Sequence, residues 1–367
     1  MKKTFLSIAL GFVCANLINA QGINKDSSLQ ITGSADVYYN YNFAQSKNPS
    51  VGSADALMGT KPNSIDFGLL DLHVKKEFGK SSIFTELAFG PRADGAKDAS
   101  PSAYYLQNLY FSYQIQKQLS VTAGIMYRYD MYEKLTPADN FNYLASNAFR
   151  ESRKIPTRSV GVKANYSINE KISVSLGLFN TINNQTPNST DNVTSAPNFG
   201  LSDVVAQLYV NPTNNLKLSA AVWKEGQKSN GTHENLQAHY QANKGLYLGL
   251  DFNNYSGMDS ATQAINACNN FTSVGLYAQK AITSIFSLGA RLEHEQTEQN
   301  TVSNMYVKEN YNILTLTGKE TFGGLSLKQE LKYDLTDGSN VNTPYMDKSG
   351  NPTKNDVQLV IAAVFAF

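Results

Sequence analysis

The feature that most constrains the fold is a strict alternation of apolar and polar residues from Leu29 to Phe43. Apolar and aromatic side chains such as Val37 occupy every second position, and polar ones such as Asp36 lie between them. A period of two indicates a β-strand, because a helix would scatter both sets around its axis. The alternation holds for fifteen residues, which exceeds the about 9–11 that a tilted strand needs to cross a bilayer.

The end of the chain shows the same pattern. From Val357 to Phe367 every second residue is apolar, and such a strand would be an aggregation-prone edge in water. Pairing with Leu29–Phe43 would close a barrel whose outer face meets lipid. The ending resembles the C-terminal signal of bacterial outer-membrane barrels. We therefore expect Phe365 and Phe367 to form an assembly signal for the barrel-assembly machinery, with Phe367 at the periplasmic rim.

The first twenty residues have the features of an export signal. Lys2 and Lys3 precede an apolar segment from Phe5 to Leu17, and a small residue, Ala20, marks the expected cleavage point. This pattern predicts a secretory signal peptide over residues 1–20. Residues 21–367 are then expected to form a single outer-membrane barrel domain.

Strand-like segments recur along the rest of the chain and bring the expected count to about 16, within two. They lie near 65–78, 82–90, 103–116, 118–129, 158–168, 171–181, 201–210, 216–225, 235–242, 246–255, 270–278, 284–295, 305–318, 325–334 and 356–367.

The connections between these segments alternate in length. Short polar turns such as Asn169–Lys171 and Phe322–Gly324 are followed by long loops such as 91–102 and 130–157. Outer-membrane barrels have this asymmetry of short periplasmic turns and long extracellular loops. The sequence therefore predicts an all-β fold, a transmembrane antiparallel up-and-down β-barrel, in the outer membrane of a Gram-negative bacterium.

Composition agrees with a barrel. The mean hydropathy is −0.33, and no apolar run beyond the signal approaches a transmembrane helix. Barrel strands expose only alternate side chains to lipid, so their average hydropathy stays low. Without Lys2 and Lys3 the chain has 29 basic and 30 acidic residues, a net charge of −1. The chain lacks the concentrated basic region that would indicate a nucleic-acid partner.

Assigning the apolar faces to lipid turns charges of both signs inward. A barrel of about 16 strands has room for an aqueous channel, so we expect passive diffusion of small hydrophilic solutes. The expected lumenal set is Asp36, Asp71, His73, Lys75, Glu86, Arg128, Lys163, Glu225, His239, Asp251, Arg291, Glu293, Lys328, Glu330 and Lys332.

The loop 130–157 is a candidate constriction, because acidic groups in its first half are followed by basic groups in its second half. Opposed charges in a loop folded into the lumen would create a transverse field. An external, solvated loop explains the same residues equally well. The candidate pore-lining residues are Arg128, Asp130, Glu133, Asp139, Arg150, Arg153, Lys154 and Arg158.

A family resemblance falls in the same region. The residues that carry it are Gly124, Tyr132-Glu133, the run Asp139–Tyr143, Ser146, Phe149, Pro156, Gly161-Val162 and Tyr166. Over about 50 residues, this pattern resembles the middle of the Putative beta-barrel porin-2, OmpL-like family, common in Bacteroidota. The resemblance implies a porin-like role and supplies no catalytic residues.

Other functions are less well supported by the residues. No G-x-S-x-G motif, Cys/His cluster or glycine-rich phosphate loop occurs, so we expect no enzyme activity, metal or cofactor. Asp71 and His73 share one face and could pair, which we interpret as a solvated pair in a channel wall. A plugged barrel acting as an adhesin, receptor or structural anchor is the alternative. An outer-membrane hydrolase using His73 or His239 is a third hypothesis, and a homo-oligomer stays open.

Overall fold

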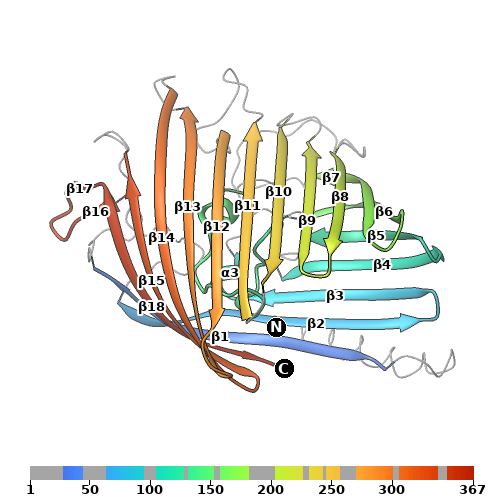
Figure 1. Ribbon diagram of the computed structural model, residues 1–367, viewed down its shortest axis with the longest axis horizontal. Helices are drawn as coiled ribbons and strands as arrows, with labels where there is room; N and C mark the ends of the chain where they lie inside the picture. The colour runs from blue at the N-terminus through green and yellow to red at the C-terminus, as the bar shows by residue number, and fades with distance from the viewer. Residues whose placement is uncertain are drawn as a thin grey trace, which may run out of the picture.

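Sixteen long antiparallel strands close into a barrel, in which consecutive strands pair and the last pairs with the first (Figure 1). The computed structural model describes residues 28–43, 63–94, 105–127, 131–152, 158–181, 203–225, 231–242, 245–256, 270–300, 306–337 and 345–367. The predicted fold class and strand count are confirmed. The predicted signal peptide lies outside the described residues.

The barrel strands follow the predicted segments closely. They are β1 (Gln30–Asn42), β2 (Ser64–Phe78), β3 (Ser81–Phe89), β4 (Leu106–Gln116), β5 (Leu119–Tyr127), β6 (Arg158–Ser167), β7 (Ile172–Thr181), β8 (Asp203–Thr213), β9 (Leu216–Lys224), β10 (Thr232–Gln241), β11 (Leu246–Ser256), β12 (Asn270–Ala281), β13 (Phe286–Asn300), β14 (Tyr306–Phe322), β15 (Leu325–Thr336) and β18 (Asn355–Ala366).

Short elements lie in the connections. A two-stranded hairpin, β16 (Tyr345–Met346) with β17 (Pro352–Thr353), forms between β15 and β18, where the sequence predicts only a loop. The helical turns are α3 (Pro91–Asp94), η2 (Pro137–Asp139) and α4 (Asn147–Ser152). None of the helices in the described part of the chain is long and apolar enough to span a membrane.

The seam between β1 and β18 closes the barrel as predicted. Ala35 lies opposite Phe365 in an antiparallel register, and Gly33 exchanges two backbone hydrogen bonds of 2.9 Å with Phe367. A Cβ at Gly33 would lie only 2.8 Å from the Phe367 ring. Glycine is therefore needed where the last aromatic ring covers the first strand.

Seven short turns join β2–β3, β4–β5, β6–β7, β8–β9, β10–β11, β12–β13 and β14–β15. The up-and-down topology places all of them at the end of the barrel where β18 finishes. Gly79 and Gly323 have positive φ values of 59° and 60° in two of these turns, a conformation that glycine adopts without a steric penalty. This agrees with the predicted alternation of short and long connections.

The two faces of the wall divide as predicted. Outward side chains are apolar and exposed, as at Phe111, Leu176 and Phe365, which are 61%, 62% and 51% exposed. The expected lumenal charges share the inward face of their strands wherever the structure describes them. In the C-terminal part of β18 the inward face is apolar as well, because Val360, Ala362 and Val364 are buried. The reason for this exception is a loop inside the barrel.

Candidate functional site

The segment 131–152, which we call the lumenal loop, lies inside the barrel between β5 and β6. Its residues 135–137 and 142–149 are buried. It hydrogen-bonds to inward side chains of β2, β13, β14 and β15. Because β13 and β14 lie opposite β5 and β6 in the strand order, the loop crosses the lumen from one wall to the other.

Arg291 of β13 is the main polar anchor of the lumenal loop. Its guanidinium lies 2.8 Å from Glu133 Oε1 and 2.7 Å from Glu293 Oε2, and it also donates to the carbonyl oxygens of Leu144 and Ala145. The Arg291 side chain is fully buried. A buried cation is tolerated when its hydrogen-bond donors are matched in this way.

Two charged residues of β15 hold the loop backbone. Glu330 accepts hydrogen bonds of 2.8 Å from the backbone N–H groups of Tyr143 and Leu144. Lys328 donates bonds of 2.6 Å to the carbonyl oxygens of Pro137 and Asn140. These contacts satisfy peptide groups of the buried loop, which is necessary because unpaired buried peptide groups are costly. The Pro137 oxygen also accepts a 3.4 Å bond from the Asn140 N–H.

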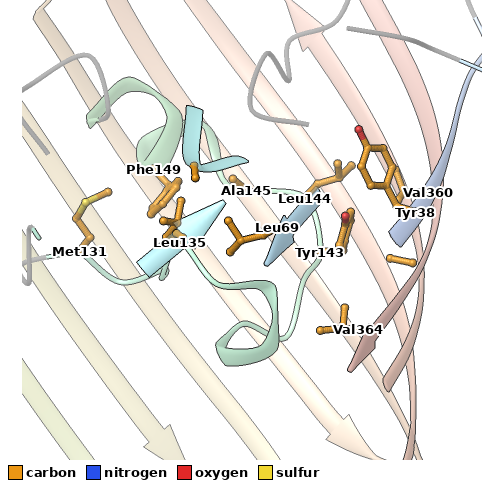
Figure 2. Packing of buried hydrophobic residues seen from close by; sticks show 13 residues of the cluster. Tyr38, Leu69, Met131, Leu135, Tyr143, Leu144, Ala145, Phe149, Val360 and Val364 are labelled. Carbon is orange, nitrogen blue, oxygen red and sulfur yellow. The ribbon is translucent and has the colours of Figure 1, made fainter. Parts of the chain in front are cut away.

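An apolar cluster adds to the polar anchors. Figure 2 shows Tyr143 and Leu144 of the lumenal loop packed near Tyr38 of β1 and Val360 and Val364 of β18. The Tyr143 hydroxyl also donates to Asp36. The inward apolar residues of β18 therefore form a dry contact with the loop, rather than lining a water channel.

Aromatic groups anchor the first part of the loop to another wall. Tyr132 stacks on His239 of β10 and on Tyr277 of β12, with ring centroids 4.6 and 4.3 Å apart. Its hydroxyl lies 2.9 Å from that of Tyr247 on β11. Gly249 leaves the space, since a Cβ there would meet the Tyr132 hydroxyl.

Cavities remain on both sides of the lumenal loop. One of about 310 Å³ separates the loop from β2–β6 and is lined by Glu86, Lys134 and Lys163 among other polar residues. Another of about 230 Å³ separates it from β10–β12. Asp139 borders both cavities. The loop therefore narrows the lumen but leaves polar space beside it.

The structure describes some of the predicted constriction residues. Glu133 is 6% exposed and bound to Arg291, while Asp139 is exposed to both cavities. Arg150 falls within α4, and Arg158 begins β6. The residues Arg128, Asp130, Arg153 and Lys154 lie outside the described residues.

Sequence reasoning missed the contacts that hold the loop. Arg291, Lys328 and Glu330 are predicted to face the lumen, but as channel lining, whereas the structure shows each bound to the loop. A signal was present in β18, where the inward Val360 and Val364 are as apolar as the outward face. The Asp71–His73 pair is confirmed at 2.8 Å, but Asp71 is buried and not solvated.

The fold and the lumenal loop together define an outer-membrane β-barrel of the porin class. The sequence pattern of the family described as Putative beta-barrel porin-2, OmpL-like, matches residues 28–367. The chain belongs to this family, as the motif in the lumenal loop predicts, and it is an outer-membrane porin. No protein with a curated description matches the chain.

Solved structures show the same architecture at low sequence identity. OmpT of Vibrio cholerae is 11% identical with a TM-score of 0.59, covering 94% of this chain and 98% of its own. The outer-membrane channel DcaP of Acinetobacter baumannii is 13% identical, with a TM-score of 0.57 and coverages of 94% and 99%. An anion-selective porin from Comamonas acidovorans is 13% identical, with a TM-score of 0.56 and coverages of 93% of this chain and 100% of its own. These likenesses concern the fold.

Proposed function

We propose that small hydrophilic solutes cross this porin by passive diffusion beside the lumenal loop, and that the loop sets the width of the path. The observation that carries this proposal is the pair of cavities that flank an anchored loop and have charged and polar side chains in their walls. A water-filled path needs polar walls, and a loop fixed to the opposite wall gives it a defined width. We further propose that the protein has no enzymatic activity.

Selectivity in this channel should be modest. The cavity beside β2–β6 has acidic groups, Glu86 and Asp139, and basic groups, Lys134 and Lys163. Charges of both signs near one path attract neither cations nor anions exclusively, so the local balance decides which ion passes more easily.

Planar-bilayer conductance and liposome swelling test the function. The purified protein should give stepwise channels, and swelling rates should fall as the size of the sugar increases. Stable insertion without conductance or swelling would contradict the proposal. It would favour the alternative, a plugged barrel acting as an adhesin, receptor or anchor through its extracellular connections.

The second half of the constriction is proposed from sequence. Arg150, Arg153 and Lys154 follow the acidic residues of the loop, and Arg128, Asp130 and Arg158 flank it. Replacing Arg150, Arg153 and Lys154 together with Gln should shift ion selectivity toward cations, measured as a reversal potential in a salt gradient. Unchanged selectivity and conductance would remove these residues from the constriction.

Assembly is proposed to depend on the terminal strand. Phe365 and Phe367 stack with ring centroids 6.1 Å apart at the closure seam, a position suited to recognition by the barrel-assembly machinery. Deleting Phe367 should lower the amount of folded barrel in outer-membrane fractions while leaving the conductance of each assembled channel unchanged. Normal assembly of this variant would contradict the proposed role of Phe367 in the assembly signal.

A homo-oligomer is a separate proposal. A similar protein, OmpT of Vibrio cholerae, is described in a trimer form. Cross-linking of the purified barrel in mild detergent would test it, and a monomer at all protein concentrations would contradict it.

A further inference from the structure

Three potential metal ligands converge on the lumenal wall. Asp71 and His73 of β2 share the inward face, and His73 lies directly opposite Glu86 of β3 in the strand register. His73 Nε2 is 2.8 Å from Asp71 Oδ2 and 3.9 Å from Glu86 Oε1. One ligand atom from each residue lies within 4.8 Å of the others. His73 and Glu86 border the 310 Å³ cavity, so the cluster can be reached from the lumen.

Neighbouring residues fix the orientation of the two carboxylates. Asn108 of β4 donates a hydrogen bond to Glu86 Oε2, and its own side-chain oxygen accepts one from the backbone of Tyr127. Thr136 of the lumenal loop donates a 2.9 Å bond to Asp71 Oδ2. Metal sites in proteins have such outer partners, which orient the ligands before the ion binds.

A second observation supports a cation-binding role for this cluster. Asp71 is only 1% exposed, and its Oδ1 atom has no hydrogen-bond partner among the described residues. His73 Nε2 is also buried, and it lies 2.8 Å from Asp71 Oδ2. A buried carboxylate oxygen without a partner loses its hydration and gains nothing in return. A bound cation would satisfy Asp71 Oδ1.

We propose that Asp71, His73 and Glu86 form a binding site for a divalent transition-metal cation such as Zn²⁺ or Co²⁺. One imidazole and two carboxylates suit these ions, which bind nitrogen and oxygen at about 2.0–2.2 Å. Three protein ligands would leave a further coordination position for water or for a carboxylate of a solute that enters the neighbouring cavity. Lys134 and Lys163 line the same cavity and would draw such an anion toward the metal.

Metal titrations of the intact, chelator-treated barrel in detergent test this site. Zn²⁺ should bind at one equivalent in calorimetry, and Co²⁺ should give a saturable visible absorption that Zn²⁺ abolishes. Glu86→Gln, which keeps the size of the side chain, and His73→Asn should each weaken binding by at least about tenfold. The control is His294→Asn, because His294 bonds to Asn312 away from this cluster. It should leave binding unchanged.

Two results would overturn the proposal. One is the absence of saturable binding to the wild-type barrel, which would mean that His73 is simply an imidazolium paired with two carboxylates. The other is equal affinity in the wild type and in folded Glu86→Gln. Folding is checked by the heat-dependent gel mobility of the barrel. Binding is measured without conductance, so failure of the diffusion proposal leaves this test unaffected, and the reverse also holds.

Discussion

Two walls of the same lumen use charged residues in opposite ways. The anchored wall, formed by β13, β14, β15, β18 and β1, presents Arg291, Lys328 and Glu330, all 0% exposed and all bonded to the lumenal loop. The open wall, formed by β3–β6, presents Glu86 and Lys163 to a cavity of about 310 Å³. Both walls have the same alternating sequence pattern.

The difference shows that an inward charge on a barrel strand has two distinct roles. On the anchored wall it satisfies backbone groups and ionic partners of a loop, and removing it leaves buried groups unmatched. On the open wall it borders a cavity, where it acts through the local field. A charge that the loop covers has the first role, and a charge that the loop leaves uncovered has the second. Mutations on the anchored wall should therefore affect loop docking, and mutations on the open wall should affect ion selectivity.

Detaching the lumenal loop should have the largest effect. Replacing residues 135–149 with Gly and Ser at equal length removes Tyr143, Leu144 and the other side chains that dock on the anchored wall. Single-channel conductance should rise severalfold, because the loop would no longer cross the lumen. The control is a Gly and Ser replacement of 226–230, within the connection between β9 and β10. Equal conductance in both variants would show that the loop does not limit the path.

Arg291→Met should weaken docking without removing the loop. Glu133 and Glu293 would then be buried without their shared cation, at a cost of about 3–5 kcal/mol. The expected result is trypsin cleavage in the loop, for which Lys134 provides an exposed site. Lys163→Met on the open wall also replaces a cation by Met, and as a control it should leave the loop protected. Cleavage in neither variant would contradict the role of Arg291 as the anchor.

The sequence predicts the wall of this barrel well but not its interior. Alternation from Leu29 to Phe43 and from Val357 to Phe367 is a local property of single strands, and it predicts both their faces and the closing pair. The lumenal loop has no such period. Its position depends on contacts between residues far apart in the chain, such as Glu133 with Arg291.

The sequence left the loop 130–157 equally compatible with a lumenal constriction and with an external loop. The loop between β5 and β6 does enter the lumen, yet Glu133 is bound to the wall while Asp139 faces the cavities. Both are acidic residues in one short segment, so composition cannot separate them. Only the three-dimensional path of the loop decides which carboxylate meets a cation from another strand.

A charge reversal on the open wall should have a smaller effect. Lys163→Glu changes the sign of a charge beside the cavity, and a difference of about 0.5 kcal/mol in ion energy would change the cation-to-anion permeability ratio by roughly twofold. The reversal potential in a KCl gradient measures this shift. Lys171→Glu, in a short turn, is the control. An equal shift in both variants would mean that the position of Lys163 has no special role.

The most localised effect is expected from a single aliphatic side chain on the anchored wall. Val360→Ala removes two carbons from a fully buried site, which should weaken loop docking by about 1.5 kcal/mol. The control is Ile361→Ala, at the adjacent outward position. This change removes more apolar area, but Ile361 faces lipid and does not contact the loop. Hydrogen exchange of the amides in 142–149 should therefore accelerate in Val360→Ala alone. Acceleration in both variants would mean that the docking of the loop depends on the general stability of β18. The inward and outward faces of this strand would then not differ in their effect on the loop.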